Sequence, residues 1–133
     1  MPSLQNLSTR AIWAGYLAMI VGNFMAILDI QIVASSLREI QAGVSASAEE
    51  IAWIQTSYLI AEVTAIPLSG LLGRALSMRT LFVISALGFT LASFACALAW
   101  NIESLIVFRT LQGFLGGGMI PTTMAALFVL FPE

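Results

Sequence analysis

The sequence contains no histidine and no lysine, and only 9% of its 133 residues are charged. Histidine is the commonest metal ligand and the usual acid/base group near neutral pH, so we expect neither a zinc site nor any other metal site. A net charge of −2 provides no basic surface for phosphates, which argues against nucleic acid as a partner. Cys96 is the only cysteine, so no disulfide can form within these residues, and we interpret it as a small packing residue.

Charge is scarce because apolar residues dominate. They make up 59% of the chain, and the mean hydropathy is +0.97. Too few polar side chains remain to cover a soluble globule, so we expect the protein to lie in a bilayer, in contact with membrane lipid. No arrangement of a nucleophile with a base and no phosphate-binding loop is present, which argues against an enzyme.

Four apolar windows are long enough to cross the hydrocarbon core, which takes about 20 residues. They predict an all-α membrane protein with transmembrane helices at about 12–35, 51–73, 80–99 and 103–131. Residues 1–11 would then form a cytoplasmic amino-terminal segment, and residues 12–133 a membrane domain. The first window lacks the basic start and the cleavage site of a signal peptide, so we expect it to remain in the mature chain.

Arginine positions predict the orientation, because cytoplasmic flanks collect basic residues. Arg10 precedes the first window, and Arg74 and Arg79 lie between the second and the third. Arg38, on the other side, stands alone among acidic residues. We therefore predict a multi-pass protein of the cell's inner (plasma) membrane, with both ends of the segment cytoplasmic.

The second window begins and continues with polar signals. Ser45, Ala46 and Ser47, followed by Glu49 and Glu50, are typical of a helix start, and we treat about thirteen residues after the first window as an outer connection. Farther along, Gln55, Tyr58 and Glu62 share one helix face. A polar line on a membrane helix is stable only when it faces protein or water, so we expect it to point inward.

The fourth window combines a charge with small residues. Arg109, Gln112 and Gly113 share one face, and Gly113 and Gly117 form a pair of glycines four residues apart. Such pairs allow close helix packing, which we consider their main role. Pro121 removes a hydrogen bond inside the same window and predicts a bend there.

Asp29 and Arg109 are the most informative charges, because each lies within an apolar window and a lone ion there is costly. A rise of about 1.5 Å per residue places both roughly 9 Å from the outer surface, so they can meet. Protonation of Asp29 would then remove the partner of Arg109 and favour another arrangement. The alternative is a static ion pair that only fixes the helix register.

Glu62 lies deeper, at roughly 16 Å by the same rise, which is near mid-membrane. Transporters commonly place binding sites at this depth, so the residue is a candidate for contact with a cationic substrate or for a second proton. The alternative is a neutral packing group. Gln55, Tyr58 and Gln112 are candidates for the same site.

Four short segments carry a family resemblance: LDIQIVA at 28–34, WIQTSYLIA at 53–61, IPLSG at 66–70 and IVFRTLQG at 106–113. They resemble the fourteen-helix drug:proton antiporters of the major facilitator superfamily, of the EmrB/QacA type. The resemblance covers nearly the whole chain after Arg10. It implies that the four helices correspond to the start of that family's amino-terminal bundle.

The resemblance also implies roles for individual residues. Asp29 matches the acid of the first helix, and Arg109, with Gln112 and Gly113, matches a fourth-helix motif associated with proton coupling. Gly70 and Arg79 match parts of a loop motif. Arg74 and Ser77 depart from that motif, because many relatives have an aspartate and a glycine there.

The resemblance implies a pump that exports amphipathic or cationic drugs and toxic compounds in exchange for protons, with a proton gradient instead of a cofactor. It allows for a periplasmic adaptor protein as a further partner. Four helices are only a fragment of fourteen, so we predict that this polypeptide does not transport without the remaining, carboxy-terminal helices. Two alternatives stay open: a four-helix scaffold or assembly subunit that does not transport, and a dimeric exporter of the small multidrug-resistance type.

Overall fold

The computed structural model describes residues 8–131 and is entirely helical over that range, apart from short links. The helices follow one another as α1 (Thr9–Ser35), α2 (Leu37–Val44), α3 (Ala48–Leu76), α4 (Met78–Ala97), α5 (Ile102–Gly117) and α6 (Met119–Leu130). Four stretches are long and apolar enough to cross a membrane: α1, α3, α4, and α5 together with α6. The predicted all-α membrane fold with four spans is confirmed.

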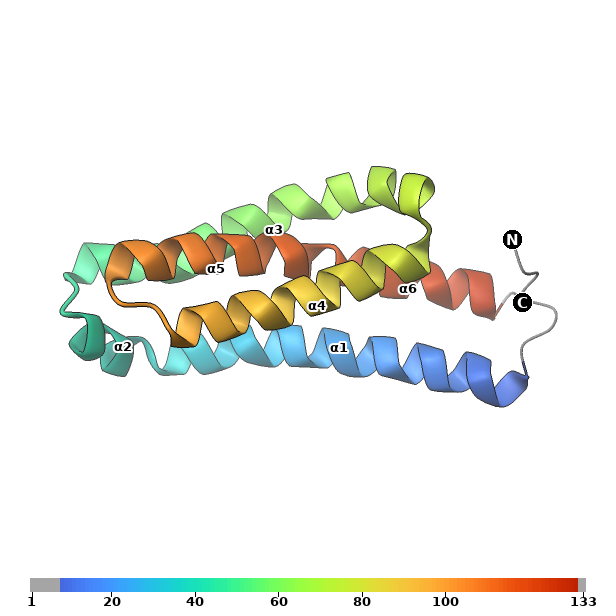
Figure 1. Cartoon of the computed structure of the whole chain (residues 1–133), viewed down its shortest axis with the longest axis horizontal. Coiled ribbons are helices and arrows are strands. Elements are labelled where there is room, and N and C mark those ends of the chain that lie inside the picture. The colour runs from blue at the N-terminus through green and yellow to red at the C-terminus, as the bar shows by residue number, and fades with distance from the viewer. Residues whose placement is uncertain (1–7, 132–133) are drawn as a thin grey trace.

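The spans lie lengthwise beside one another, and α5 and α6 follow one another along a single line (Figure 1). The short helix α2 and the α4–α5 link lie at one end of the bundle, which we call the α2 end. The start of α1, the α3–α4 link and the end of α6 lie at the opposite end (Figure 1). Arg74 and Arg79, which flank the α3–α4 link, therefore lie toward the same end as the start of α1.

The connection expected before α3 contains a short helix, α2, which the sequence analysis did not predict. In α2, Leu37, Ile40 and Val44 recur at helical spacing and pack against a buried cluster of Ile51 and Ile54. The cluster also includes Leu105 of α5. Partial burial of this apolar face holds α2 against the end of the bundle.

The fourth span consists of two helices that meet at Gly118, three residues before Pro121, where the sequence predicted a bend. Pro121 has no backbone N–H, so the carbonyl of Gly117 loses its helical donor. Glycines also weaken the helix at this point. The hydroxyls of Thr122 and Thr123 donate to the carbonyls of Gly118 and Met119, which adds hydrogen bonding on the α6 side of the break.

Helix α3 begins where the sequence predicted a helix start, and Ser47 is its N-cap. The backbone N–H of Glu50 donates to the Ser47 hydroxyl at 3.2 Å, and the Ser47 N–H donates to the Glu50 carboxylate at 2.8 Å. This capping box satisfies two backbone donors that the first helical turn leaves free. It fixes where α3 begins, and thereby the register of its polar face.

Helix α5 packs mainly on α3 and α4. Gly113 faces the backbone of Tyr58, and Gly117 faces that of Glu62 and the side chain of Ala65. A side chain at Gly117 would place its Cβ 2.6 Å from the Glu62 carbonyl oxygen, where no atom fits. The two glycines thus let α5 and α3 approach closely, which brings the polar faces of the two helices together.

We expect Gly113→Ala to lower stability by about 1–3 kcal/mol, because its methyl group would overlap the Tyr58 carbonyl. Gly70→Ala is the matched control. A Cβ at Gly70 meets nothing within 4 Å, and alanine favours a helix by up to about 1 kcal/mol over glycine. Thermal unfolding of both variants in detergent checks the expectation. Equal midpoints would show that the α3–α5 contact is looser than described.

Candidate functional site

The centre of the candidate site is an ion pair between two spans. Nη1 of Arg109 on α5 lies 2.6 Å from Oδ2 of Asp29 on α1. The Arg109 side chain is only 2% exposed, whereas that of Asp29 is 21% exposed. The guanidinium is therefore enclosed by protein, and the carboxylate is the partner that other groups can still reach.

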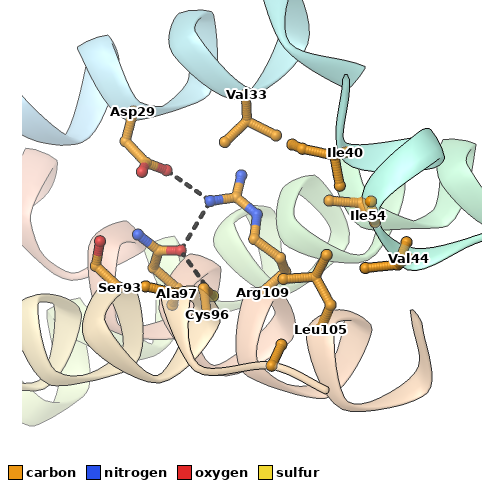
Figure 2. Close-up of a pocket in the computed structure, with 13 residues that line it drawn as sticks. Asp29, Val33, Ile40, Val44, Ile54, Ser93, Cys96, Ala97, Leu105 and Arg109 are labelled. Carbon is orange, nitrogen blue, oxygen red and sulfur yellow. Dashed lines mark hydrogen bonds and ion pairs between the residues drawn. The ribbon is translucent and has the colours of Figure 1, made fainter. Parts of the chain in front are cut away.

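Gln112 completes the polar contact from the next turn of α5. Its Oε1 accepts a hydrogen bond from Nη1 of Arg109 at 2.7 Å, and it also accepts from the Cys96 thiol of α4 at 3.6 Å. One nitrogen of Arg109 thus serves both Asp29 and Gln112, as Figure 2 shows. Nη1 of Arg109 thus joins α5 to α1, and Oε1 of Gln112 joins α5 to α4.

Tyr58 of α3 supports the arginine from another side. The Cζ atom of Arg109 lies 4.2 Å from the centroid of the Tyr58 ring, a distance at which a cation is attracted by the ring face. Tyr58 is fully buried, so the attraction acts away from water. Gln55, one turn earlier, donates to the Ile30 carbonyl of α1 at 3.5 Å and so lies between the two helices.

Glu62 is on the same helix but outside this contact. It is 9% exposed, and its carboxylate forms no ion pair with any residue in the range 8–131. Its backbone faces Gly117 of α5. Of the candidate residues, the structure thus groups Asp29, Arg109, Gln112 and Tyr58 closely, and keeps Glu62 apart on the inner face of α3.

The loop-motif residues lie far from this group, toward the opposite end of the bundle. Gly70 and Arg74 are exposed near the end of α3, and Arg79 is exposed in the first turn of α4. Neither arginine forms an ion pair within the described part of the chain. Ser77, where many members of the resembling family have glycine, has a φ of 73°, a conformation that glycine adopts more easily.

Sequence reasoning missed two parts of the site. Cys96 was interpreted only as a packing residue, yet its thiol donates a hydrogen bond to Gln112. A cavity of about 410 Å³, next to the ion pair, is lined partly by α2, which was not expected as a helix. The helical spacing of Leu37, Ile40 and Val44 was the sequence signal that could have indicated α2. Across residues 8–131, no three acidic or thiol side chains gather as a metal site would require.

Comparison with protein families places the chain clearly. The profile described as Major Facilitator Superfamily matches residues 19–133. The colistin resistance protein EmrB of Acinetobacter baumannii is 63% identical over 124 residues, which cover 93% of this chain and 24% of that protein. The fatty acid resistance protein FarB of Neisseria gonorrhoeae is 36% identical over 82% of this chain and 22% of its own length.

The probable multidrug resistance protein EmrY of Escherichia coli is 32% identical over 95% of this chain and 25% of that protein. The chain therefore spans about a quarter of the length of these curated relatives. No solved structure matches it. The resemblance noted from four short segments is confirmed over most of the sequence.

We expect Asp29 and Arg109 to be coupled in stability, because removing one member of a buried pair leaves the other charge uncompensated. Asp29→Asn, Arg109→Gln and the double variant form a double-mutant cycle that unfolding in detergent can measure. The coupling energy should be about 1–3 kcal/mol. A value of zero would mean that the 2.6 Å contact does not contribute to stability.

Proposed function

The chain belongs to the Major Facilitator Superfamily, whose members are transporters and not enzymes, and we propose that it forms four spans of a proton-coupled multidrug efflux transporter. Relatives named for resistance to colistin and fatty acids, and for multidrug resistance, support this class of function. The observation that carries the proposal is the Asp29–Arg109 ion pair, because it places a titratable carboxylate against a buried cation between two spans.

In the proposed mechanism, Asp29 carries the proton. When the carboxylate is ionised, it compensates the charge of Arg109 and holds α1 against α5. Protonation removes this compensation inside a low-dielectric bundle, so the guanidinium must find other acceptors or the helices must rearrange. Proton binding thereby favours one arrangement of the transporter over another, which is how a gradient drives exchange.

Substrate contact is proposed for the inner face of α3. Glu62 has no cationic partner among residues 8–131, so it is free to attract a cationic or amphipathic compound or to take up a second proton. Gln55 and Tyr58 lie on the same face, and Gln112 is near them on α5. The compound would enter from the cytoplasm or the inner leaflet, consistent with a cytoplasmic placement of both ends of this segment.

We further propose that these 133 residues do not transport alone. Alternating access requires two bundles that move against each other, and four helices do not supply them. The remaining helices of the same transporter are the first partners to expect, and a periplasmic adaptor is a further one. The scaffold alternative stays open, whereas membership of this superfamily replaces the small multidrug-resistance alternative.

Asp29→Asn should abolish gradient-driven export while leaving the protein in the membrane, because asparagine can still accept from Arg109 but cannot exchange a proton. Glu103→Gln is the control, since Glu103 is exposed at the start of α5. The measurement is ethidium efflux in vesicles with an imposed pH gradient. The protein assayed is the complete transporter, with the remaining helices present. A scaffold would export no ethidium, either unmodified or with one of these changes. Equal export by the two variants would rule out Asp29 as the proton carrier.

The α2 end should face the outside of the cell. We expect Ala42→Cys on α2 to react with an impermeant thiol reagent on intact cells. Ala75→Cys, near the end of α3, should react only after the membrane is opened. Both positions are exposed, and the variants are made with Cys96→Ala so that no other thiol of this segment reacts. The reverse pattern would invert the orientation and the side from which protons arrive.

A further inference from the structure

The side-chain amide of Gln112 receives two hydrogen bonds at the same atom. Its Oε1 accepts from Nη1 of Arg109 at 2.7 Å and from the Cys96 thiol at 3.6 Å. In Figure 2, a dashed line from the guanidinium and a dashed line from Cys96 meet at this oxygen. A carbonyl oxygen has two acceptor sites, so both sites of Oε1 are occupied. Gln112 is 1% exposed, and bulk water therefore does not compete for them.

The chemistry of the neighbours decides which end of the amide faces them. A guanidinium carries donors and no acceptor, so it can bond Oε1 but not the amide nitrogen of Gln112. The opposite orientation would place Nε2 against Nη1, donor against donor. Nε2 has no hydrogen-bond acceptor among residues 8–131, so no contact on the nitrogen side holds the amide. The hydrogen bonds that position the Gln112 side chain are therefore the two to its oxygen.

The hydrogen bond from Cys96 connects the amide to a different helix. Arg109 and Gln112 lie on neighbouring turns of α5, so the bond between them does not fix either side chain relative to the other spans. Cys96 is on α4, which packs extensively on α5. Its side chain lines the cavity beside the ion pair, and its thiol reaches across to α5. The packing of α4 on α5 thereby fixes where Oε1 of Gln112 lies.

The position of Oε1 matters most when Asp29 is protonated. In the ionised state, Nη1 of Arg109 donates both to Oδ2 of Asp29 at 2.6 Å and to Oε1 of Gln112. Protonation removes the charge of the carboxylate, and Oε1 is then the acceptor that Nη1 retains. An enclosed guanidinium that lacks acceptors is costly. The bond to Gln112 therefore stabilises the protonated state more than the ionised state.

We propose that Cys96 is a positioning residue of the ion-pair site, whose thiol holds Oε1 of Gln112 against Arg109 and thereby favours proton uptake by Asp29. The proposal rests on the proposed function, in which Asp29 carries the proton. Among the described residues, the thiol bonds neither member of the ion pair, so it acts through Gln112. When Asp29 is protonated, Arg109 stays bonded to Gln112, and α1 is the helix that is released.

Other titratable and charged groups lie on the helices around this contact. Apart from Cys96 on α4, they are Asp29 on α1, Arg38 and Glu39 on α2, Tyr58 and Glu62 on α3, and Arg109 on α5, while α6 carries no charged side chain. A substitution at Cys96 leaves all of them in place. A change in the proton dependence of export in such a variant therefore reports the hydrogen bond of the thiol.

The experiment compares two changes at Cys96 in the complete transporter. Cys96→Ser keeps a donor at this position, whereas Cys96→Val is of similar size to cysteine and has no donor. Ser93→Ala is the matched control, because Ser93 lies on the same helix and lines the same cavity but does not bond Gln112 in the described part of the chain. The measurement is the proton concentration that gives half-maximal ethidium export in vesicles, together with the maximal rate.

Cys96→Val should need about threefold more protons for half-maximal export, because the loss of one weak hydrogen bond affects the protonated state more than the ionised one. Cys96→Ser and Ser93→Ala should match the unmodified transporter. A residue that only fills space would change the amount of folded protein or the maximal rate, and the proton dependence would stay the same. Cys96→Ala carries the same test if Cys96→Val does not accumulate in membranes.

The S–H stretching band of Cys96 provides a spectroscopic measurement of the same contact. This band lies apart from the other infrared bands of a protein, and Cys96→Ser identifies it by difference. Gln112→Met removes the acceptor and should raise the frequency of the band, because a hydrogen bond lowers the frequency of an S–H stretch. In the unmodified transporter the band should shift between high and low pH, and Asp29→Asn should abolish that shift.

Equal proton dependence of export in Cys96→Val and the unmodified transporter would overturn the positioning role. A shift in Cys96→Ser as large as that in Cys96→Val would also overturn it, and so would an S–H band that does not respond to Gln112→Met. The proposed function survives these outcomes as long as Asp29→Asn abolishes export. If Asp29→Asn exports like the unmodified transporter, the proposed function fails and the positioning role fails with it.

Discussion

The rest of the structure depends on the burial of one cation. A guanidinium that is 2% exposed within an apolar bundle is stable only if the protein replaces the water it has lost. Asp29 supplies the opposite charge from α1, Gln112 an acceptor from α5, and Tyr58 a ring face from α3. Because these groups come from separate spans, the requirement of Arg109 also fixes how the spans pack, and the glycine contact between α3 and α5 brings them within reach.

The spans themselves were predictable, because a length of about 20 apolar residues is a strong and local signal. Two features were not predicted, because the hydropathy of a segment does not report the geometry of its backbone. Helix α2 is too short to register as a span, although its apolar residues recur at helical spacing and pack on Ile51 and Ile54. The break at Gly118 lies within a uniformly apolar stretch, and only the loss of the N–H at Pro121, four residues after Gly117, distinguishes it.

The site was predictable in part for a different reason. Few charges lie inside the spans, so Asp29 and Arg109 had little choice of partner at equal depth, and helical spacing placed Gln112 on the same face as Arg109. The cavity was not predictable, since it depends on how five helices pack against one another. The hydrogen bond from Cys96 to Gln112 was not predictable either, because it joins residues on different helices without any charge to indicate it.

Among residues 8–131, no ion pair forms across the α3–α4 link, so this link contributes no ion pair that would favour one conformation of the segment. Arg74 and Arg79 carry the same sign, both are exposed, and neither pairs with an acid in the described part of the chain. Ser77 lies between them in a backbone conformation that L side chains rarely adopt, although its hydroxyl accepts from the Thr80 N–H and so caps α4. No ion pair among the described residues therefore holds this link in one arrangement. Solvent screens exposed charges far more than enclosed ones, so the enclosed pair of Asp29 and Arg109 is the stronger electrostatic contact.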